Sequence, residues 1–230
     1  VACLILKTLL EDIPKYGNND FTLKDDKGRD VVVHGLANAL RHVGKQVKTA
    51  TEKELAEFYP TDPDGSRPIT YLWARTVRCE ATGCGAEIPL VTSFWLSKKT
   101  ERPLAIRYRV EHSRGKPPRV AFEIFTPRNE AELPTSTVSR AKATCPCCHN
   151  VLPAQRVRSQ LSEQHGGAVA LFDNSGKHIG GAILLAVVIL KANASGRHYR
   201  LPTKRDYLQV YSAHQRLSEM DSSYIPNEPT

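Results

Sequence analysis

The sequence has no run of about 18 apolar residues free of charge, which a membrane-spanning helix requires. The best candidate, Gly180 to Leu190, is too short for that and is typical of a buried strand. No signal peptide is recognisable either. We therefore expect a cytoplasmic protein without a membrane partner.

Familiar catalytic motifs are also missing. There is no G-x-x-x-x-G-K-[ST] phosphate loop, no G-x-G-x-x-G fingerprint, no H-E-x-x-H helix and no G-x-S-x-G nucleophile elbow. The eight histidines are scattered, and no Cys–His nucleophile pair stands out. We therefore predict no catalytic residue and no residue that binds an organic cofactor.

What the sequence does contain is an ordinary globular composition, with 40% hydrophobic and 24% charged residues in a chain of 230. Such a length can bury a core as one large domain or two small ones. The first residue is Val rather than Met, and the chain opens directly into an apolar helical pattern. It ends at Ile225-Pro-Asn-Glu-Pro-Thr230 without a closing element, so we expect a piece of a longer protein.

Cysteine is the most informative residue type. Five of the six cysteines fall in two clusters, Cys79-Glu-Ala-Thr-Gly-Cys84 and Cys145-Pro-Cys-Cys148, and each cluster runs on to an aliphatic residue and a proline. The C-x4-C and C-x2-C spacings are typical of a zinc ribbon, in which two turns present four thiolates to one tetrahedral ion. We predict that Cys79, Cys84, Cys145 and Cys148 are the ligands of a structural Zn²⁺.

Other interpretations of this region remain open. Disulfides or free thiols are one alternative, although Cys3 lies in an apolar stretch and nothing points to secretion. Cys147 is predicted to be a spare thiol, and His149 could replace a ligand or hydrogen-bond to one. A catalytic zinc would keep one coordination position open beside a glutamate, for which Glu80 and Glu87 are the candidates.

The net charge of +8 is concentrated around the cysteines. Residues 67–160 carry 16 Lys and Arg against 7 Asp and Glu, whereas the rest of the chain carries 16 against 17. A local surplus of this kind favours a polyanionic partner such as a nucleic acid. A solvated surface that binds nothing is the alternative.

Periodicity and turn residues indicate the α+β class in three segments. We predict a helical segment over 1–66, a β-rich zinc-ribbon lobe over 67–160, and a small α/β segment over 161–230. The helices expected in the first segment cover 1–16 and 31–48, with a loop or short hairpin between them.

Within the lobe, Arg102 to Val110 and Arg119 to Phe125 alternate in polarity around Gly115-Lys-Pro-Pro118, which predicts a β-hairpin. Strands are expected at 87–96 and 136–143, and a helix at 153–164. Tyr71, Leu72 and Trp73 are predicted core residues. In the last segment, Thr203 is the expected cap of a helix that begins at Lys204.

Several linked motifs then resemble a known family. In chain order they are Tyr71-Leu-Trp-Ala-Arg-Thr-Val-Arg-Cys79, Cys84-Gly-Ala-Glu-Ile-Pro-Leu90, Phe94-Trp-Leu-Ser-Lys-Lys99, Thr137-Val-Ser-Arg140, Cys145-Pro-x-Cys148, Tyr199-Arg-Leu-Pro-Thr203 and Ile225-Pro-Asn-Glu-Pro229. Together they resemble the region around the zinc-ribbon insertion of bacterial adenine-specific DNA methylases, the large type that begins with a domain of unknown function. The likeness covers most of the chain and is weakest at 18–30 and 161–180.

The resemblance implies a parent enzyme that transfers a methyl group from S-adenosylmethionine to adenine in DNA, as in restriction-modification. It places the glycine-rich cofactor loop upstream of this chain and the Asp/Asn-Pro-Pro-Tyr motif far downstream. The partners would be DNA and the rest of the parent methyltransferase, whose core and linker include residues 1–66. The family usually has glycine where this chain has His149, so we expect a slightly altered turn there without loss of metal.

A basic ribbon in such an enzyme could hold the duplex while the target base is extruded. The candidates for phosphate contact are Arg75, Arg78, Lys98, Lys99, Arg107, Arg109, Arg140, Arg156 and Arg158, with Arg102 and Lys142 extending the set. Strand alternation places Arg107 and Arg109 on one face. The competing hypotheses are a non-enzymatic zinc-ribbon module that binds nucleic acid or protein, and a scaffold that binds neither.

Overall fold

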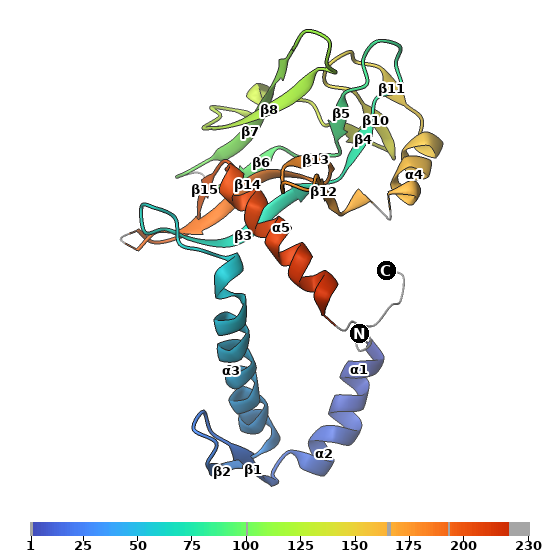
Figure 1. Cartoon of the computed structure of the whole chain (residues 1–230). Helices are drawn as coiled ribbons and strands as arrows, with labels where there is room; N and C mark the ends of the chain where they lie inside the picture. The colour runs from blue at the N-terminus through green and yellow to red at the C-terminus, as the bar shows by residue number, and fades with distance from the viewer. Residues whose placement is uncertain (1, 100, 165–166, 193, 221–230) are drawn as a thin grey trace. The chain divides into compact units, whose positions relative to one another are not determined.

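The computed structural model describes residues 2–99, 101–164, 167–192 and 194–220 (Figure 1). It has helices and antiparallel strands in small separate sheets, which confirms the predicted α+β class. Backbone contacts divide the chain into two compact units, one ending at Glu57 and the other beginning at Phe58. Within the described ranges, no helix combines the length and hydropathy that a membrane crossing requires.

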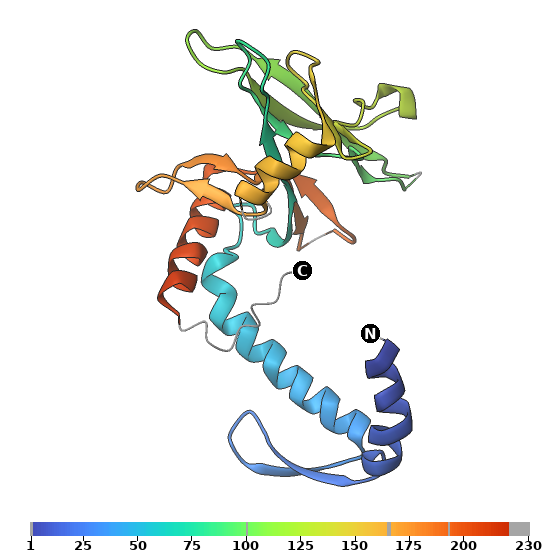
Figure 2. The same ribbon diagram turned by 90° about the vertical axis from the view of Figure 1, so that its right-hand side faces the viewer.

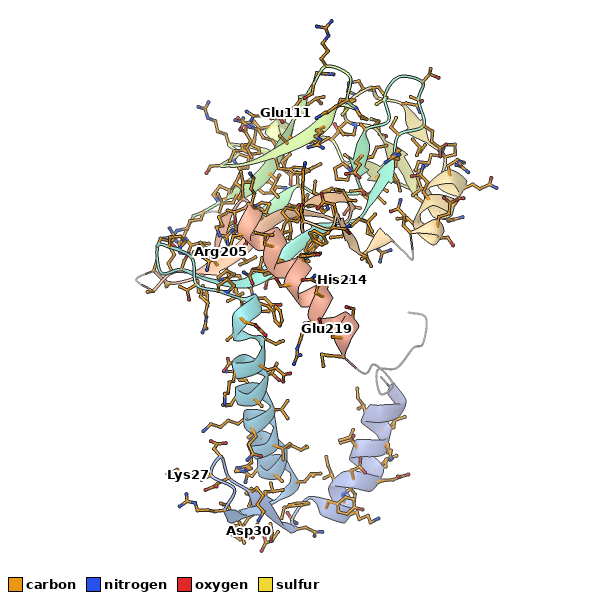
Figure 3. The ribbon with its side chains drawn as sticks, viewed as in Figure 1. Lys27, Asp30, Glu111, Arg205, His214 and Glu219 are labelled. Atoms are coloured by element: carbon orange, nitrogen blue, oxygen red, sulfur yellow. The ribbon has the colours of Figure 1, made fainter. Side chains whose placement is uncertain are left out.

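The N-terminal unit contains two helical stretches and one hairpin. Its elements are α1 (Ala2–Lys7), a π-helical turn (Thr8–Asp12), α2 (Ile13–Tyr16), β1 (Asp20–Lys24), β2 (Asp30–His34) and α3 (Leu36–Leu55). A 3-10 turn (Ala56–Phe58) spans the boundary to the second unit. Lys27 lies in the turn of the hairpin, and Asp30 begins β2 (Figure 3). The predicted helix over 1–16 is confirmed from Ala2 onward as a helical stretch with a π turn inside it, and Val1 lies outside the described residues.

The predicted helix over 31–48 is wrong at its start. Val31 pairs with Leu23 and Val33 pairs with Phe21, so these residues belong to a strand. Three consecutive β-branched valines favour that strand. Gly35 then turns the chain with a φ of 79°, and the helix begins at Leu36.

The C-terminal unit holds the remaining elements. They are β3 (Arg67–Ala74), β4 (Thr76–Arg78), β5 (Glu87–Pro89), β6 (Trp95–Ser97), β7 (Leu104–Glu111), β8 (Arg119–Phe125), a 3-10 turn (Glu130–Glu132), β9 (Val138–Ser139), β10 (Lys142–Thr144), β11 (Val151–Leu152), α4 (Ala154–Glu163), β12 (Ala170–Phe172), β13 (His178–Gly181), β14 (Ile183–Leu190), β15 (His198–Arg200) and α5 (Lys204–Glu219). The sheet orders are β15-β14-β3, β6-β7-β8, β11-β10-β9, β4-β5 and β12-β13, and every pairing is antiparallel.

The pairing of β3 with β14 joins distant parts of the chain. It runs from Ile183 opposite Ala74 to Leu190 opposite Arg67. The sheet therefore combines the start of the predicted zinc lobe with the predicted 161–230 segment. The division into three segments, with boundaries at 66/67 and 160/161, stays a prediction.

Two hydrophobic clusters form the core of this unit. One surrounds the cysteines and includes Val77, Ile88, Leu152 and Val157. The helix α4 packs on β4 and β10 in this cluster (Figure 2). The other cluster lies between the β3–β14 pair and the β6–β7–β8 sheet, with Phe94 and Ile106 buried against Ala186.

The predicted hairpin of β7 and β8 is confirmed, since Ala105 to Glu111 pair continuously with Arg119 to Phe125. The strand predicted over 136–143 is instead two strands around a tight turn. Arg140 and Ala141 have φ values of 47° and 61°, which is the conformation of a type I′ hairpin turn. The strand predicted over 87–96 is likewise two short strands, β5 and β6.

The prediction that Trp73 is a core residue is wrong. It remains 37% exposed, and its ring meets the edge of Tyr207 from α5. Tyr71 and Leu72 are half-buried. The buried residue of this stretch is Ala74, because the outer strand β3 has only one face covered.

A polar network fixes the start of α5. Thr203 accepts a hydrogen bond from the amide of Asp206, and Asp206 accepts one from the amide of Thr203, a reciprocal capping box that confirms the predicted cap. Arg200 also donates two hydrogen bonds to Asp206 and two to Asp62. This network ties the 59–66 connector to β15 and α5.

Candidate metal centre

Two hairpins, β4–β5 and β10–β11, present the four predicted cysteine ligands, and we call their cysteine-bearing turns the first and the second knuckle. Cys79 follows β4 and Cys84 precedes β5, while Cys145 follows β10 and Cys148 precedes β11. In each hairpin the first cysteine donates its amide across the strands, from Cys79 to the carbonyl of Ala86 and from Cys145 to that of Asn150. The two turns are thus built in the same way from different sequences.

The four Sγ atoms lie close together although the two cysteine pairs are more than 60 residues apart in the sequence. The Sγ atoms of Cys79 and Cys148 lie 3.5 Å apart, and those of Cys84 and Cys145 lie 3.8 Å apart. All four lie within 4.8 Å of one another. A disulfide would need about 2.05 Å, whereas sulfurs around a tetrahedral ion with bonds of about 2.3 Å stand about 3.8 Å apart. The cluster therefore fits a metal ion rather than two disulfides.

Backbone amides supply a second feature of a thiolate site. Each of the four sulfurs accepts a hydrogen bond from the amide two residues further on. The donors are Ala81 to Cys79, Ala86 to Cys84, Cys147 to Cys145 and Asn150 to Cys148. Amide dipoles aimed at sulfur stabilise its negative charge, so both turns are shaped for thiolates.

The thiols differ in their surroundings. Burial raises the pKa of Cys79 and of Cys84, while the amide of Asn150 lowers the pKa of the exposed Cys148. Buried thiols of this kind ionise when a metal ion displaces the proton. Burial also raises the pKa of Cys147 to about 12, which agrees with a spare thiol that stays neutral.

His149 takes no place in the cluster. Its side chain is exposed, and its amide donates to the carbonyl of Cys145. Its φ is 62°, the same value as that of Gly85, the residue after the last cysteine of the first knuckle. The histidine thus adopts the left-handed conformation that a glycine favours, and the slightly altered turn that we expect relative to the family stays a prediction.

The helix α4 clamps the first knuckle. The side-chain oxygen of Gln160 accepts from the amide of Arg78 at 2.7 Å, and its nitrogen donates to the carbonyl of Arg78 at 3.0 Å and to Glu80 at 2.8 Å. Arg156 grips the same Glu80 carboxylate with its Nε and Nη2 atoms. Glu80 is therefore engaged in packing the hairpin and is not free to act as a base beside a catalytic metal.

Four of the predicted phosphate contacts are ion-paired within the chain. Arg107 pairs with Glu123, Arg109 with Glu111, Lys98 with Glu130 and Arg156 with Glu80. Arg107 and Arg109 do lie on one exposed face of β7, as the alternation predicts. Arg75, Arg78, Lys99, Arg140 and Arg158 have no ion pair among the described residues.

The structure does gather some cations into a groove between two turns. The groove lies between residues 96–99 and 101–104, around the β6–β7 connection, and residues 195–199, which lead into β15. It has a volume of about 740 Å³. It is lined by four cations, Lys98, Lys99, Arg102 and Arg197, and one carboxylate, Glu101. Sequence reasoning did not select Arg197, because only the β14–β15 turn brings it opposite the β6–β7 connection.

Comparison with models of protein families, with curated proteins and with solved structures finds no match to this chain. The geometry of the site itself therefore carries the interpretation. The chain holds a four-cysteine cluster that can bind a metal ion. Four sulfur ligands leave no open position for a substrate, which is the arrangement of a structural site.

Proposed function

We propose that residues 67–160 form a structural zinc ribbon that binds the DNA backbone, within a region of an S-adenosylmethionine-dependent DNA adenine methyltransferase. The observation that carries the zinc part is the convergence of four cysteine Sγ atoms within 4.8 Å. When bound, Zn²⁺ supplies four thiolate bonds that hold the two knuckles together. Four thiolates in a tetrahedral set suit Zn or Fe and disfavour Mg and Ca. We choose zinc of these two because the C-x4-C and C-x2-C spacings are typical of a zinc ribbon.

The DNA-binding part is supported by the basic groove. Lys99, Arg102 and Arg197 line it and have no ion pair among the described residues, while Lys98 is shared with Glu130 at 3.8 Å. Unpaired cations on two facing turns suit a chain of phosphates, because each neutralised phosphate releases a condensed counterion. The remaining candidates that have no carboxylate partner, such as Arg158, would extend this surface.

The methyltransferase part rests on the linked sequence motifs from Tyr71 to Cys148. In such a parent the ribbon would hold the duplex while other residues extrude the target base. The present chain is then expected neither to bind S-adenosylmethionine tightly nor to methylate DNA, and either activity would contradict the proposal. A glycine-rich loop encoded upstream and an Asp/Asn-Pro-Pro-Tyr motif downstream support a methyltransferase parent. The absence of both favours a non-enzymatic binding module.

A salt series tests the DNA-binding part. Fluorescence anisotropy with a labelled duplex should give a slope of about −3 to −4 in log K against log salt concentration, as expected for four phosphate contacts. Lys99→Ala and Arg197→Ala should each reduce the slope by about 1. The matched control is Arg109→Ala, because Arg109 lies outside the groove and already pairs with Glu111.

Two results would count against DNA binding. One is the absence of a salt-dependent anisotropy change at micromolar protein. The other is an equal slope for the native chain and both groove variants. Zinc content and thermal melting of each variant establish that the protein tested is folded.

A further inference from the structure

A second pocket lies beside the β4–β5 hairpin, away from the basic groove. Three hairpins enclose it: β4–β5, the turn between β7 and β8, and β12–β13. Its volume is about 360 Å³, within the range of small-ligand sites, which begins at roughly 300 Å³. None of its lining residues lines the basic groove.

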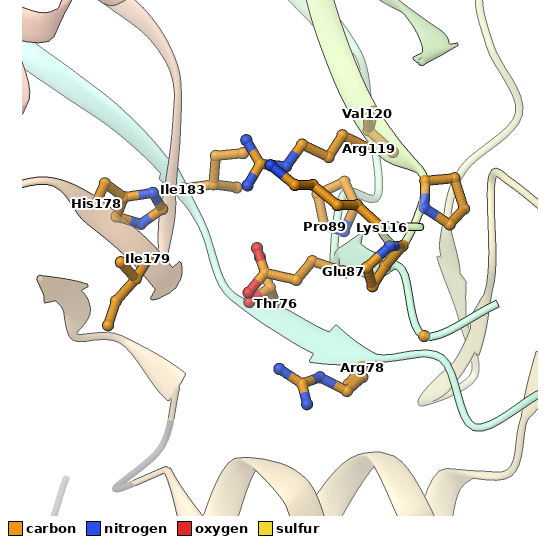
Figure 4. A pocket seen from close by; sticks show the side chains of 13 residues that line it. Thr76, Arg78, Glu87, Pro89, Lys116, Arg119, Val120, His178, Ile179 and Ile183 are labelled. Atoms are coloured by element: carbon orange, nitrogen blue, oxygen red, sulfur yellow. The ribbon is translucent and has the colours of Figure 1, made fainter. Parts of the chain in front are cut away.

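The carboxylate of Glu87 points into the middle of this pocket (Figure 4). Burial raises the pKa of Glu87, and no lysine or arginine of the described residues lies within ion-pair distance of it. Gly180 leaves room for this side chain, because a Cβ at that position would stand only 2.8 Å from the Oε1 atom of Glu87. Glu87 is therefore a hydrogen-bond acceptor in the pocket that forms no side-chain hydrogen bond or ion pair among the described residues.

Three cations surround that acceptor. Arg78 approaches from one side of Glu87 and Arg119 from the other, and Lys116 reaches in from the β7–β8 turn (Figure 4). None of the three forms an ion pair among the described residues. The pocket thus has a surplus of positive charge and one carboxylate, which suits a ligand with both an anionic group and hydrogen-bond donors.

The remaining walls are flat and weakly polar. Pro117 and Pro118 line one side, and Ile183 and the ring of His178 line another. Burial lowers the pKa of His178, its Nε2 lies 2.9 Å from the carbonyl of Ala182, and its ring lies against Tyr207 with centroids 4.6 Å apart. His178 is therefore an anchored, neutral wall, and it adds no charge to the site.

We propose that this pocket binds a guanine nucleotide unit, with its phosphate held by Lys116 and Arg119 and its base edge held by Glu87. A carboxylate accepts two parallel hydrogen bonds. Guanine presents two adjacent donors, N1–H and the exocyclic amino group, on its Watson–Crick edge. Adenine, cytosine and uracil place an acceptor next to each donor, and that acceptor would face the carboxylate. The flat proline and isoleucine walls accommodate the purine.

Calorimetric titration of the 230-residue chain with GMP, AMP, CMP and UMP tests the proposal. GMP should bind at least about tenfold more tightly than the other three, and guanosine without phosphate should bind more weakly than GMP. Glu87→Gln should weaken GMP by about tenfold and improve AMP relative to it, because an amide offers the donor and acceptor that adenine matches. Arg119→Ala should weaken all four nucleotides alike, and Arg109→Ala, outside the pocket, should change none.

The source of the nucleotide is distinguished by a second ligand. A single-stranded oligonucleotide that carries one guanine should compete with GMP if the natural ligand is a unit of a nucleic acid strand, and should not compete if it is a free nucleotide. Equal affinity for the four nucleotides, no binding at millimolar concentration, or insensitivity to both Glu87→Gln and Arg119→Ala would overturn the proposal. Because the pocket and the groove share no residue, loss of duplex binding in Lys99→Ala is a separate result.

Discussion

Gly85 and His149 occupy the same position of two equivalent turns and have the same φ of 62°. Each follows the last cysteine of its knuckle, and each is followed by the amide that donates to that cysteine's Sγ, Ala86 to Cys84 and Asn150 to Cys148. The left-handed residue is what turns this amide toward the sulfur. The two knuckles therefore end in the same backbone conformation, which glycine adopts easily at position 85 and histidine adopts less easily at position 149.

Exchanging these two residue types should move stability in opposite directions. His149→Gly should raise the free energy of unfolding by up to about 1 kcal/mol, since a non-glycine residue in this region costs about 1–2 kcal/mol and glycine loses part of that gain through chain entropy. Gly85→Ala should lower it by about 1 kcal/mol. A methyl group at Gly85 would meet Pro117 at an ordinary 3.7 Å, so the cost comes from φ and not from a clash. Urea denaturation of the zinc-loaded protein measures both, and a loss of stability in His149→Gly contradicts the equivalence.

Removal of one cysteine ligand should remove the metal. Cys148→Ser should reduce zinc from about one ion per chain to near zero and unfold the knuckles, because binding of a structural metal is folding free energy. Cys147→Ser is the matched control: it deletes a neighbouring thiol outside the four-sulfur cluster and should keep its zinc. Elemental analysis and melting curves read out both variants. Equal zinc content in the two would refute the assignment of Cys148.

Gln160 should be required for the packing of the first knuckle. Gln160→Leu keeps the volume but leaves the amide and carbonyl of Arg78 without their side-chain partners, which should cost about 1–3 kcal/mol. Gln155→Leu, an exposed position on the same helix, should cost less than about 0.5 kcal/mol. Urea titrations compare them. Similar costs at both positions would mean that the hydrogen bonds to Arg78 contribute nothing specific.

The ion pair between the half-buried Arg200 and the buried Asp206 should make stability depend on acid pH. Burial alone would raise the pKa of Asp206, but hydrogen bonds from Arg200 and Thr203 outweigh it and hold the pKa below its usual value. A lowered folded-state pKa means that the stabilisation is complete above the unfolded value of about 3.9 and is lost as pH falls through the folded value. Asp206→Asn should therefore cost about 3 kcal/mol at pH 7 and much less near pH 2.

Tryptophan fluorescence measures the unfolding of the C-terminal unit in this experiment, since Trp73 and Trp95 both lie in that unit. Glu101→Gln is the control, because Glu101 is exposed and has no ion pair among the described residues. An Asp206→Asn deficit that stays constant from pH 7 to pH 2 would contradict the role of this carboxylate.

Local patterns in the sequence were sufficient for several features. Close cysteine spacing selects the knuckles, since two thiols within a six-residue turn can reach one ion whatever lies around them. Alternating polarity around Gly115-Lys-Pro-Pro118 selects the β7–β8 hairpin, and Thr203 selects the start of α5. The start of α3 was predicted wrongly, because apolar periodicity alone placed Val31 to Val33 in the helix. These β-branched residues instead form a strand that pairs with β1.

Only the tertiary structure decided which charged residues are ion-paired and which line a groove or a pocket. Arg107 and Arg156 are exposed basic residues in the sequence, but Glu123 and Glu80 neutralise them from other strands and turns. Arg197 and Lys99 meet in one groove, and Glu87 meets Arg119 in one pocket, only because hairpins far apart in the chain fold together. The physical reason is distance. A turn or a cap depends on neighbours within a few residues, whereas ion pairing depends on separations of a few ångströms that the order of the residues does not specify.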